Sequence, residues 1–388
     1  MSEVRVAGVG LTPFGEYAER TTRELFAEAS ASAIDDADVA RTDVEEVLYG
    51  NFLGELSERQ GHQGPLMAEA AGVQAPAARY EAACASGSAP VREAVKRIRS
   101  GESDVLLVGG AERMTNLTTG DATEALATAA DDLWEVRAGV TFPGAYALMA
   151  RAYFDTYGGS REALAHVAVK NHEHALSNER AHHQQAIAVS DVLEAPQISS
   201  PLGLYDSCPI SDGAAALVLT SESYAEEHDL DASVAITGTG QGGDRLALHD
   251  REFLARSPAT RRAGERAYDD AGISADEVDV AEVHDCFTIA EVLAIEALDL
   301  EPIGEGISAA RDGRTTIDGD RPVNLSGGLK AKGHPVGATG TAQIAEIAAL
   351  LRGDHPNSEY VEDATTALTH NAGGTVATAI VHVLEVVA

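Results

Sequence analysis

A cysteine stands among very small side chains in Y-E-A-A-C-A-S-G-S-A-P, residues 80 to 90. Free cysteine is among the most buried residue types and often serves only as packing, so Cys84 by itself fits a small core residue. We predict that a helix begins at Ala85. The sulfur would then lie at a helix N-terminus, where unpaired N–H groups and the positive end of the dipole favour the thiolate. This placement favours a nucleophile with room for an acyl group beside it.

A histidine occupies a glycine-rich stretch, S-G-G-L-K-A-K-G-H-P-V-G-A-T-G, at residues 326 to 340. A histidine before proline is usually a structural loop residue. His334 and Cys84, however, each precede a helix that ends near a glycine and is followed by an apolar strand. This equivalence predicts a cysteine–histidine pair in which the imidazole is the base that activates the thiol.

Two further segments carry reactive groups at predicted strand ends. In V-H-D-C-F-T, residues 283 to 288, His284 and Cys286 alternate along an extended chain and therefore point to the same side. A metal site needs more ligands than these two, and we predict none. In T-H-N-A-G-G-T, residues 369 to 375, a glycine turn offers backbone N–H groups to an oxyanion.

An internal repeat indicates how these groups are positioned. Residues 33 to 50 and 267 to 284 share the pattern A-x-D-D-A followed by an acidic turn and a strand, at a constant offset of 234. Alternating helices and strands predict an α/β fold with two pseudo-symmetric lobes built on central sheets. We assign residues 1–112 plus 206–232 to the N-terminal lobe, 113–205 to an inserted loop domain that folds over a ligand, and 233–388 to the C-terminal lobe.

Composition limits the partners and the setting. Acidic residues outnumber basic ones by 62 to 28, for a net charge of −34, and the only lysines are Lys96, Lys170, Lys330 and Lys332. Nucleic acid is excluded as a partner, because its binding depends on basic groups that neutralise phosphates. Such self-repulsion is relieved in concentrated salt, where the Debye length falls to about 3 Å, so we expect a halophilic protein. An ordinary acidic protein is the alternative.

Cysteine usage and hydropathy suggest the location. The chain has three cysteines, at 84, 208 and 286, which cannot all pair and match no zinc pattern. No run of apolar residues is long enough to span a membrane, and the N-terminus has no signal-peptide pattern. We expect a cytoplasmic protein with reduced thiols and no membrane association.

The ordered set of motifs resembles the thiolase family, and most closely its sterol-carrier-protein-type and archaeal members. The resemblance runs the whole chain and is carried by seven motifs: C-A-S-G-S at 84–88, N-H at 171–172, C-P-I-S-D-G-A-A-A at 208–216, H-D-C-F at 284–287, N-L-S-G-G at 324–328, G-H-P-V-G-A-T-G at 333–340 and H-N-A-G-G at 370–374. It implies the thiolase fold, layered αβαβα, in a chain we expect to be haloarchaeal.

The resemblance also implies the chemistry: acyl transfer between acyl-CoA and acetyl-CoA, in the direction of Claisen condensation or of thiolysis. Cys84 matches the nucleophile and His334 its base. The better-known thiolases carry an acid/base cysteine near the C-terminus where this chain has Asn371, so the proton-transfer role moves to Cys286. His284 is expected to hold a water at the enolate, and Gly373 is expected to donate to the oxyanion. Cys208 matches a structural position.

Binding of coenzyme A is predicted from the same resemblance, with CoA thioesters as substrates and no other cofactor. Ser326 and Gly327 match a pantetheine-contacting loop, while Lys332 and His172 are candidates for contact with CoA. Solvated surface groups are the alternative for Lys330, Lys332 and the histidines of the insert. Phe142, Tyr146 and Met149 fit an acyl pocket, but their spacing favours a buried helix face.

The family implies a homodimer or a dimer of dimers, and in archaea a small OB-fold partner with a zinc ribbon that joins the thiolase to HMG-CoA synthase. Ketoacyl synthases and HMG-CoA synthase use the same fold and nucleophile, but a second catalytic thiol at Cys286 fits neither. A non-catalytic scaffold is a further alternative, although no catalytic residue is missing.

Overall fold

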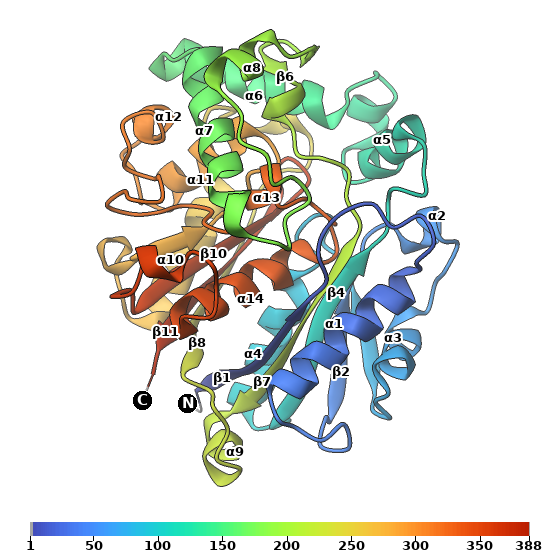
Figure 1. Cartoon of the computed structure of the whole chain (residues 1–388). Helices are drawn as coiled ribbons and strands as arrows, with labels where there is room; N and C mark the ends of the chain where they lie inside the picture. The colour runs from blue at the N-terminus through green and yellow to red at the C-terminus, as the bar shows by residue number, and fades with distance from the viewer. Residues whose placement is uncertain (1–2, 388) are drawn as a thin grey trace.

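Nine strands form one mixed sheet in the computed structural model, which describes residues 3–387 (Figure 1). Their order across the sheet is β3-β2-β4-β7-β1-β8-β11-β10-β9. The strands of this sheet are β1 (Val4–Leu11), β2 (Glu46–Gly50), β3 (Ala77–Tyr80), β4 (Val105–Glu112), β7 (Gly213–Ser221), β8 (Val234–Gly243), β9 (Val280–Glu282), β10 (Thr366–Gly373) and β11 (Thr378–Val386).

The two halves of this sheet repeat one pairing pattern. From the outside inwards, β2 is parallel to β4, which is antiparallel to β7, and β7 is antiparallel to β1. In the second half β9 is parallel to β10, which is antiparallel to β11, and β11 is antiparallel to β8. The halves meet where β1 and β8 pair through only two residue pairs. The predicted pseudo-symmetry is confirmed, and the two half-sheets join at their edges.

Helices cover the sheet in layers. The α-helices are α1 (Thr22–Asp36), α2 (Gly54–Ser57), α3 (Gln63–Ala71), α4 (Ser88–Ser100), α5 (Thr119–Ala127), α6 (Phe142–Tyr157), α7 (Arg161–His174), α8 (Val189–Glu194), α9 (Glu222–Glu227), α10 (Pro258–Ala271), α11 (Thr288–Ala297), α12 (Gly306–Ala309), α13 (Gly328–Ala331) and α14 (Thr339–Arg352). Helices α4 and α14 contact strands of both halves, while α1 packs on the first half and α10 on the second. This is the predicted αβαβα layering.

The central helix pair fixes the position of the reactive loops. Helix α14 is buried along nearly all its length, and α4 buries its apolar stripe. The two helices begin close together, since a Cβ on Gly87 would lie 2.7 Å from the backbone nitrogen of Gly340. The hydroxyl of Thr341 donates to the carbonyl of Gly87 at 2.8 Å. Cys84 and His334, which precede these helices, are therefore brought together.

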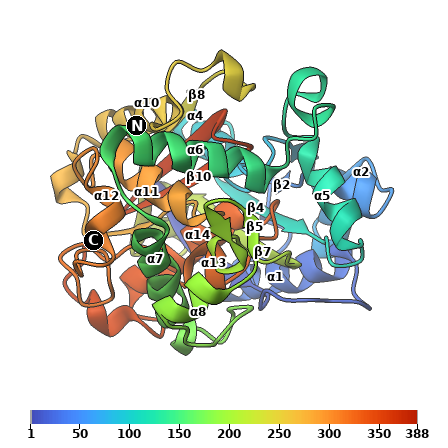
Figure 2. The ribbon, with the colours of Figure 1, turned by 90° about the horizontal axis from the view of Figure 1, so that it is seen from above.

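The segment between β4 and β7 lies over one end of the sheet (Figures 1 and 2). It contains α5 to α8, a π-helical turn at Asp132–Val136 and the small sheet of β5 (Gln197–Ser199) and β6 (Leu202–Gly203). The predicted domain limit at 112/113 falls at the end of β4, and the limit at 232/233 falls just before β8. The domain limits remain predictions. Residues 1–2 and 388, at the ends of the predicted lobes, lie outside the described part of the chain. No helix within residues 3–387 is long and apolar enough to cross a membrane.

Candidate active site

Cys84 lies in a tight turn that precedes α4. The helix begins at Ser88 rather than at the predicted Ala85, because residues 85 to 87 form hydrogen-bonded turns in which Ala85 N–H donates to Ala82. Ala83 has the left-handed φ of 51°, a conformation that few residues with a Cβ adopt. The strained turn presents the sulfur four residues ahead of the helix.

Burial, rather than the helix end, dominates the electrostatics of Cys84. Its side chain is 9% exposed, and burial raises the pKa of the thiol to about 12, although the backbone N–H of Gly374 donates to the sulfur and acts in the opposite direction. The expected thiolate is therefore absent in the resting protein. The thiol needs a base that takes its proton as the reaction proceeds.

His334 has the geometry of that base. Its Nδ1 lies 2.7 Å from Thr339 Oγ1, whose own proton is donated to the carbonyl of Pro335. Thr339 therefore accepts a hydrogen bond from Nδ1–H, and Nε2 is left with a free lone pair. Nε2 is buried and has no hydrogen-bond partner in residues 3–387. Burial lowers the pKa of His334 to about 3, so the imidazole is neutral near pH 7.

His284 has the opposite tautomer. The side-chain amide of Asn371 donates to His284 Nδ1 at 3.0 Å, which places the ring proton on Nε2. Burial lowers the pKa of His284 well below its usual range, so the ring is a neutral N–H donor. One histidine of the site thus offers a lone pair and the other offers a proton. Thr339 and Asn371 set these states, and the sequence analysis assigned neither of them this role.

The two histidines and the cysteine converge. The sulfur of Cys84 and one ring nitrogen each from His284 and His334 all lie within 4.8 Å of one another. The rings of the two histidines are edge to face, with centroids 5.0 Å apart. The trio has the composition of a metal site, yet the opposed tautomers give a thiol a base on one side and an N–H donor on the other.

A cavity of about 350 Å³ opens onto two members of this trio, Cys84 and His334. All three cysteines of the chain line it, together with Phe142, Tyr146 and Gly374 among others. The acyl-pocket interpretation therefore fits Phe142 and Tyr146, whereas Met149 packs in the hydrophobic core, as the helix-face interpretation predicted. Cys208 donates its backbone N–H to the carbonyl of Cys286, which holds it beside the second reactive thiol.

Cys286 contacts the phenol of Tyr146, which the sequence analysis considered only as a residue of the acyl pocket or of a buried helix face. Burial raises the pKa of its thiol, and a hydrogen bond with Tyr146 acts in the opposite direction. Tyr146 donates to the carbonyl of Gly374 at 3.0 Å and stacks on Phe287 at 4.6 Å. The phenol thus connects Cys286 to the glycine turn that touches Cys84.

The glycine turn after β10 packs directly on the Cys84 turn. A Cβ on Gly373 would lie 2.3 Å from the carbonyl oxygen of Ala82, so only glycine fits this approach. Gly374, the next residue, is the one whose N–H reaches the Cys84 sulfur. The predicted Gly373 is therefore adjacent to the nucleophile, and Gly374 is an additional donor.

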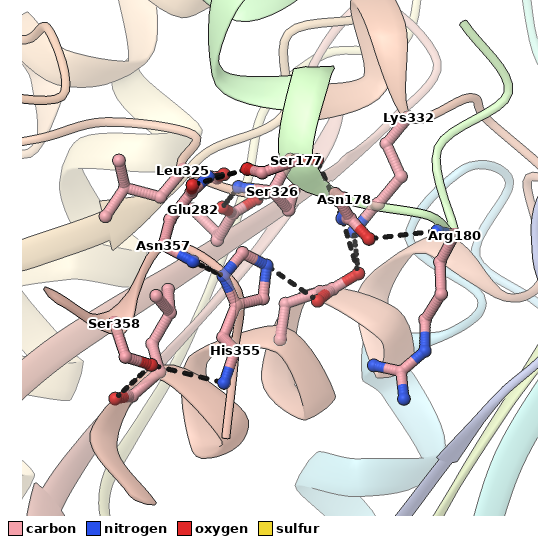
Figure 3. Close-up of polar contacts among 12 residues, drawn as sticks. Ser177, Asn178, Arg180, Glu282, Leu325, Ser326, Lys332, His355, Asn357 and Ser358 are labelled. Carbon is pink, nitrogen blue, oxygen red and sulfur yellow. Dashed lines mark hydrogen bonds and ion pairs between the residues drawn. The ribbon is translucent and has the colours of Figure 1, made fainter. Parts of the chain in front are cut away.

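The residues predicted to contact CoA lie outside the lining of the catalytic cavity. Ser326 is fully buried, and both its N–H and its hydroxyl donate to Glu282. Gly327 lies against Ala175, and Lys332 is 2% exposed with its ammonium 3.6 Å from Glu346 (Figure 3). The structure gives these three residues internal partners, and none of them lines the catalytic cavity. His172 lines a second cavity instead, described below.

The Lys332 ion pair belongs to a buried network that anchors the loop before His334. Glu346 on α14 also lies 3.2 Å from Nε2 of His355, and Asn178 donates to it at 3.4 Å (Figure 3). Lys332 and its neighbours hold the loop against α7, α14 and the segment that follows α14. The alternative of a solvated Lys332 is wrong, because the side chain is buried beside the carboxylate of Glu346 on α14.

The comparisons with known proteins agree with this architecture. Residues 4–223 match the family model "Thiolase, N-terminal domain", and residues 240–386 match "Thiolase C-terminal domain-like". The chain belongs to the thiolase family. It is 44% identical to an acetyl-CoA acetyltransferase of Methanothermobacter thermautotrophicus over 99% of this chain and 100% of that protein.

Other relatives extend the comparison. A second acetyl-CoA acetyltransferase, from Methanocaldococcus jannaschii, is 40% identical over 99% of both chains. Human sterol carrier protein 2 is 30% identical over 96% of this chain and 70% of that protein. Among solved structures, a chain of the Ltp2-ChsH2(DUF35) aldolase superposes with a TM-score of 0.85 at 25% identity, covering 99% of this chain and 98% of that chain. The predicted similarity to archaeal and sterol-carrier-type thiolases is confirmed.

Proposed function

We propose that this chain is an acetyl-CoA C-acyltransferase that works through an acyl-Cys84 intermediate. The observation that carries the proposal is the approach of Cys84, His284 and His334 to within 4.8 Å, at a cavity that Cys286 also lines. Two thiols and two differently protonated imidazoles fit a reaction with two half-steps. The names of the relatives agree with acetyl-CoA as a substrate.

The first half-step is acyl transfer to Cys84. His334 Nε2 takes the thiol proton as the sulfur attacks the thioester carbonyl, and the proton then leaves with the CoA thiolate. Backbone N–H groups of Cys84 and of the turn at Gly373–Gly374 stabilise the tetrahedral oxyanion. Removing one such donor costs about 3 kcal/mol in comparable sites.

The second half-step forms the carbon–carbon bond. Cys286, as its thiolate, removes a proton from the methyl group of acetyl-CoA, and the enolate oxygen accepts a hydrogen bond from a water held by the Nε2–H of His284. The enolate then attacks acyl-Cys84 and displaces the Cys84 thiolate, which receives the proton that Cys286 took from the methyl group. When the thiolate forms, the phenol proton of Tyr146 turns from the carbonyl of Gly374 to the sulfur of Cys286 and stabilises the thiolate.

An aldolase-type reaction is the second candidate, because one structural neighbour is an aldolase. Retro-aldol cleavage forms no acyl-enzyme, whereas a thiolase must form one. Incubation with acetyl-CoA followed by mass analysis of the peptide that contains Cys84 separates the two. An unlabelled Cys84 together with cleavage of a β-hydroxyacyl-CoA would favour the aldolase. The same test separates the thiolase from a non-catalytic scaffold.

The acidity of the chain leads to a proposal about its working conditions. A net charge of −34 with only four lysines fits a protein that works in molar salt. Thermal unfolding measured from 0.1 to 3 M KCl tests this, with a midpoint that rises steeply with salt. An unchanged midpoint would favour an ordinary acidic protein.

Assembly is likewise a proposal. We expect a homodimer or a dimer of dimers, and a small OB-fold, zinc-ribbon partner that helps seat CoA and joins the enzyme to HMG-CoA synthase. The presence of a DUF35 chain in the aldolase neighbour is consistent with such a partner. If the purified chain alone matches the turnover of a co-expressed preparation in high salt, the partner is not required.

A further inference from the structure

A second cavity, of about 280 Å³, lies beside the catalytic one. Its lining combines apolar and polar side chains: Ile187, Leu204 and Tyr205, then His172, His183 and Lys330. Residues Leu204, Ser207, Cys208 and Pro209 line both cavities, so the two spaces share one wall. Figure 2 shows α13, which carries Lys330, near α7 of the covering segment. The proposed acyl transfer assigns no role to this space.

Lys330 is an unusual component of that lining. Its side chain is 1% exposed, and among residues 3–387 its ammonium has no hydrogen-bond partner. The other buried lysines have carboxylate partners: Lys170 lies 2.6 Å from Glu291, and Lys332, whose ammonium also lacks a hydrogen bond, lies 3.6 Å from Glu346. An unpaired buried ammonium is costly, and proteins seldom retain one without a use.

The nearest acidic groups are occupied by other donors. Asp206 accepts from the N–H of Gly203 at 2.7 Å and from the hydroxyl of Thr288 at 2.8 Å. Asp285 accepts from the amide of Asn171 and from the N–H of Leu329. Neither carboxylate forms an ion pair with the Lys330 ammonium in the described residues. The positive charge therefore remains available to a ligand in the cavity.

The two histidines add hydrogen-bonding capacity without competing charge. His172 Nδ1 bonds to the carbonyl of Gln185 at 3.0 Å, which fixes the ring at the cavity wall. Burial and then the Lys330 charge lower the pKa of His172 to about 4, and burial also lowers the pKa of His183. Both rings are thus neutral near pH 7 and leave the lysine as the single cation.

We propose that this cavity is a subsite for acyl groups that end in a carboxylate, with Lys330 as the residue that binds the terminal anion. The inference rests on the proposed acyl transfer to Cys84 and names a substrate class for it. A chain attached to Cys84 runs along the shared wall, where Leu204 contacts its methylene groups. A mostly apolar space with one cation suits a carboxylate better than a phosphate, which needs several donors.

The test compares acyl-CoA esters of equal length in the first half-step. Succinyl-CoA and glutaryl-CoA are matched with butyryl-CoA and valeryl-CoA, and acyl transfer to Cys84 is followed by mass spectrometry. Wild-type protein is expected to accept the carboxylated esters. Lys330→Met should reduce kcat/KM for them by about 30-fold or more, as loss of a buried charge partner does, and leave the neutral esters and acetyl-CoA within about twofold.

A stability readout distinguishes a binding lysine from a structural one. Lys330→Met should raise the thermal midpoint of the free protein, because it removes an unpaired buried charge. The control Lys332→Met should lower the midpoint, because it leaves Glu346 without its ammonium. Loss of stability and equal loss of activity on all esters in Lys330→Met would overturn the proposal and make the residue structural.

Two further outcomes also overturn it. If acetyl-CoA labels Cys84 normally but neither carboxylated ester does, the subsite is wrong while the proposed function stands. If Lys330→Met raises KM for acetyl-CoA but not for acetyl-pantetheine, which lacks the nucleotide phosphates, the cation binds a CoA phosphate instead. Failure of all esters to label Cys84 in wild-type protein would contradict the proposed function itself.

Discussion

Thr339 holds His334 in a single tautomer. Its hydroxyl oxygen lies 2.7 Å from His334 Nδ1, and the hydroxyl group donates a hydrogen bond to the carbonyl of Pro335. The free lone pair of the imidazole is therefore directed away from Thr339 and into a site that contains a thiol. A residue that never touches substrate thus determines which ring nitrogen acts as the base.

Thr339→Val tests this relationship. Loss of the hydroxyl frees the ring to adopt either tautomer, and we expect kcat to fall about 10- to 100-fold, as for other residues that orient a catalytic histidine. Steady-state kinetics with acetoacetyl-CoA and CoA measure the effect. Thr339→Ser is the control and should retain most of the activity. Equal losses in both variants would show that packing, not the hydroxyl, matters.

Asn371→Asp should reverse the protonation of His284. The amide now donates to Nδ1, whereas a carboxylate would accept from it and move the ring proton away from Nε2. The enolate would lose its donor, so condensation should fall by about 100-fold while acyl transfer changes less. Isotope exchange between CoA and acetyl-CoA, compared with acetoacetyl-CoA synthesis, separates the two steps. A variant with unaltered condensation would remove His284 from the mechanism.

Cys286→Ser separates the roles of the two thiols. A serine hydroxyl is far too weak an acid to exchange protons near neutral pH, whereas a free thiol titrates near 8.5. Condensation and thiolysis should therefore be lost, while labelling of Cys84 by radioactive acetyl-CoA survives. Near-normal condensation would show that another residue, His284 or His370, handles the proton. Complete loss of labelling would make Cys286 part of the first half-step.

His382 provides a pH prediction away from the site. It is fully buried, and burial, with the nearby charge of Arg92, lowers its pKa to about 3, although a hydrogen bond with the backbone of Ser88 acts in the opposite direction. The unfolded chain binds the proton below about pH 6.5, whereas the folded protein does so only near pH 3. Stability should therefore fall as pH decreases through this window.

Thermal midpoints from pH 7.5 to 4 measure that dependence in high salt. In His382→Leu, the thermal midpoint should fall less steeply as the pH decreases, and kcat at pH 7.5 should be nearly unchanged. Part of the pH dependence should remain in this variant, because burial also lowers the pKa values of His174, His334 and His370 to about 3. If the thermal midpoint of the variant falls as steeply at acidic pH as that of the wild type, His382 does not contribute to the pH dependence of stability.

The sequence predicted the fold and the reactive centre because both depend on local patterns. The repeat at offset 234 corresponds to β2 and β9, which begin at Glu46 and Val280. Small residues and glycines next to Cys84 and His334 marked the turns before α4 and α14, which the pseudo-symmetry brings together. Each of these motifs depends on residues that are close in the sequence, and the corresponding turns, helices and strands are present in the structure.

The features that the sequence could not predict depend on distant contacts. Tyr146 reaches Cys286 only because α6 lies over the catalytic cavity, and its spacing is that of any buried helix face. Helix α4 begins three residues later than predicted, because residues 85 to 87 form hydrogen-bonded turns, and Gly87 packs against the start of α14. Solvation was one alternative for Lys330 and Lys332, yet side chains from other elements bury both.

The central claim is that Cys84 carries the acyl group, and one measurement tests it most directly. Wild-type protein is mixed with acetyl-CoA in molar KCl, quenched in acid and digested for mass spectrometry. We predict one acetyl group on the peptide containing Cys84, removed by added CoA, and absent from Cys84→Ala although that variant remains folded. Acetylation that persists in Cys84→Ala, or turnover by that variant at the wild-type rate, would contradict the account.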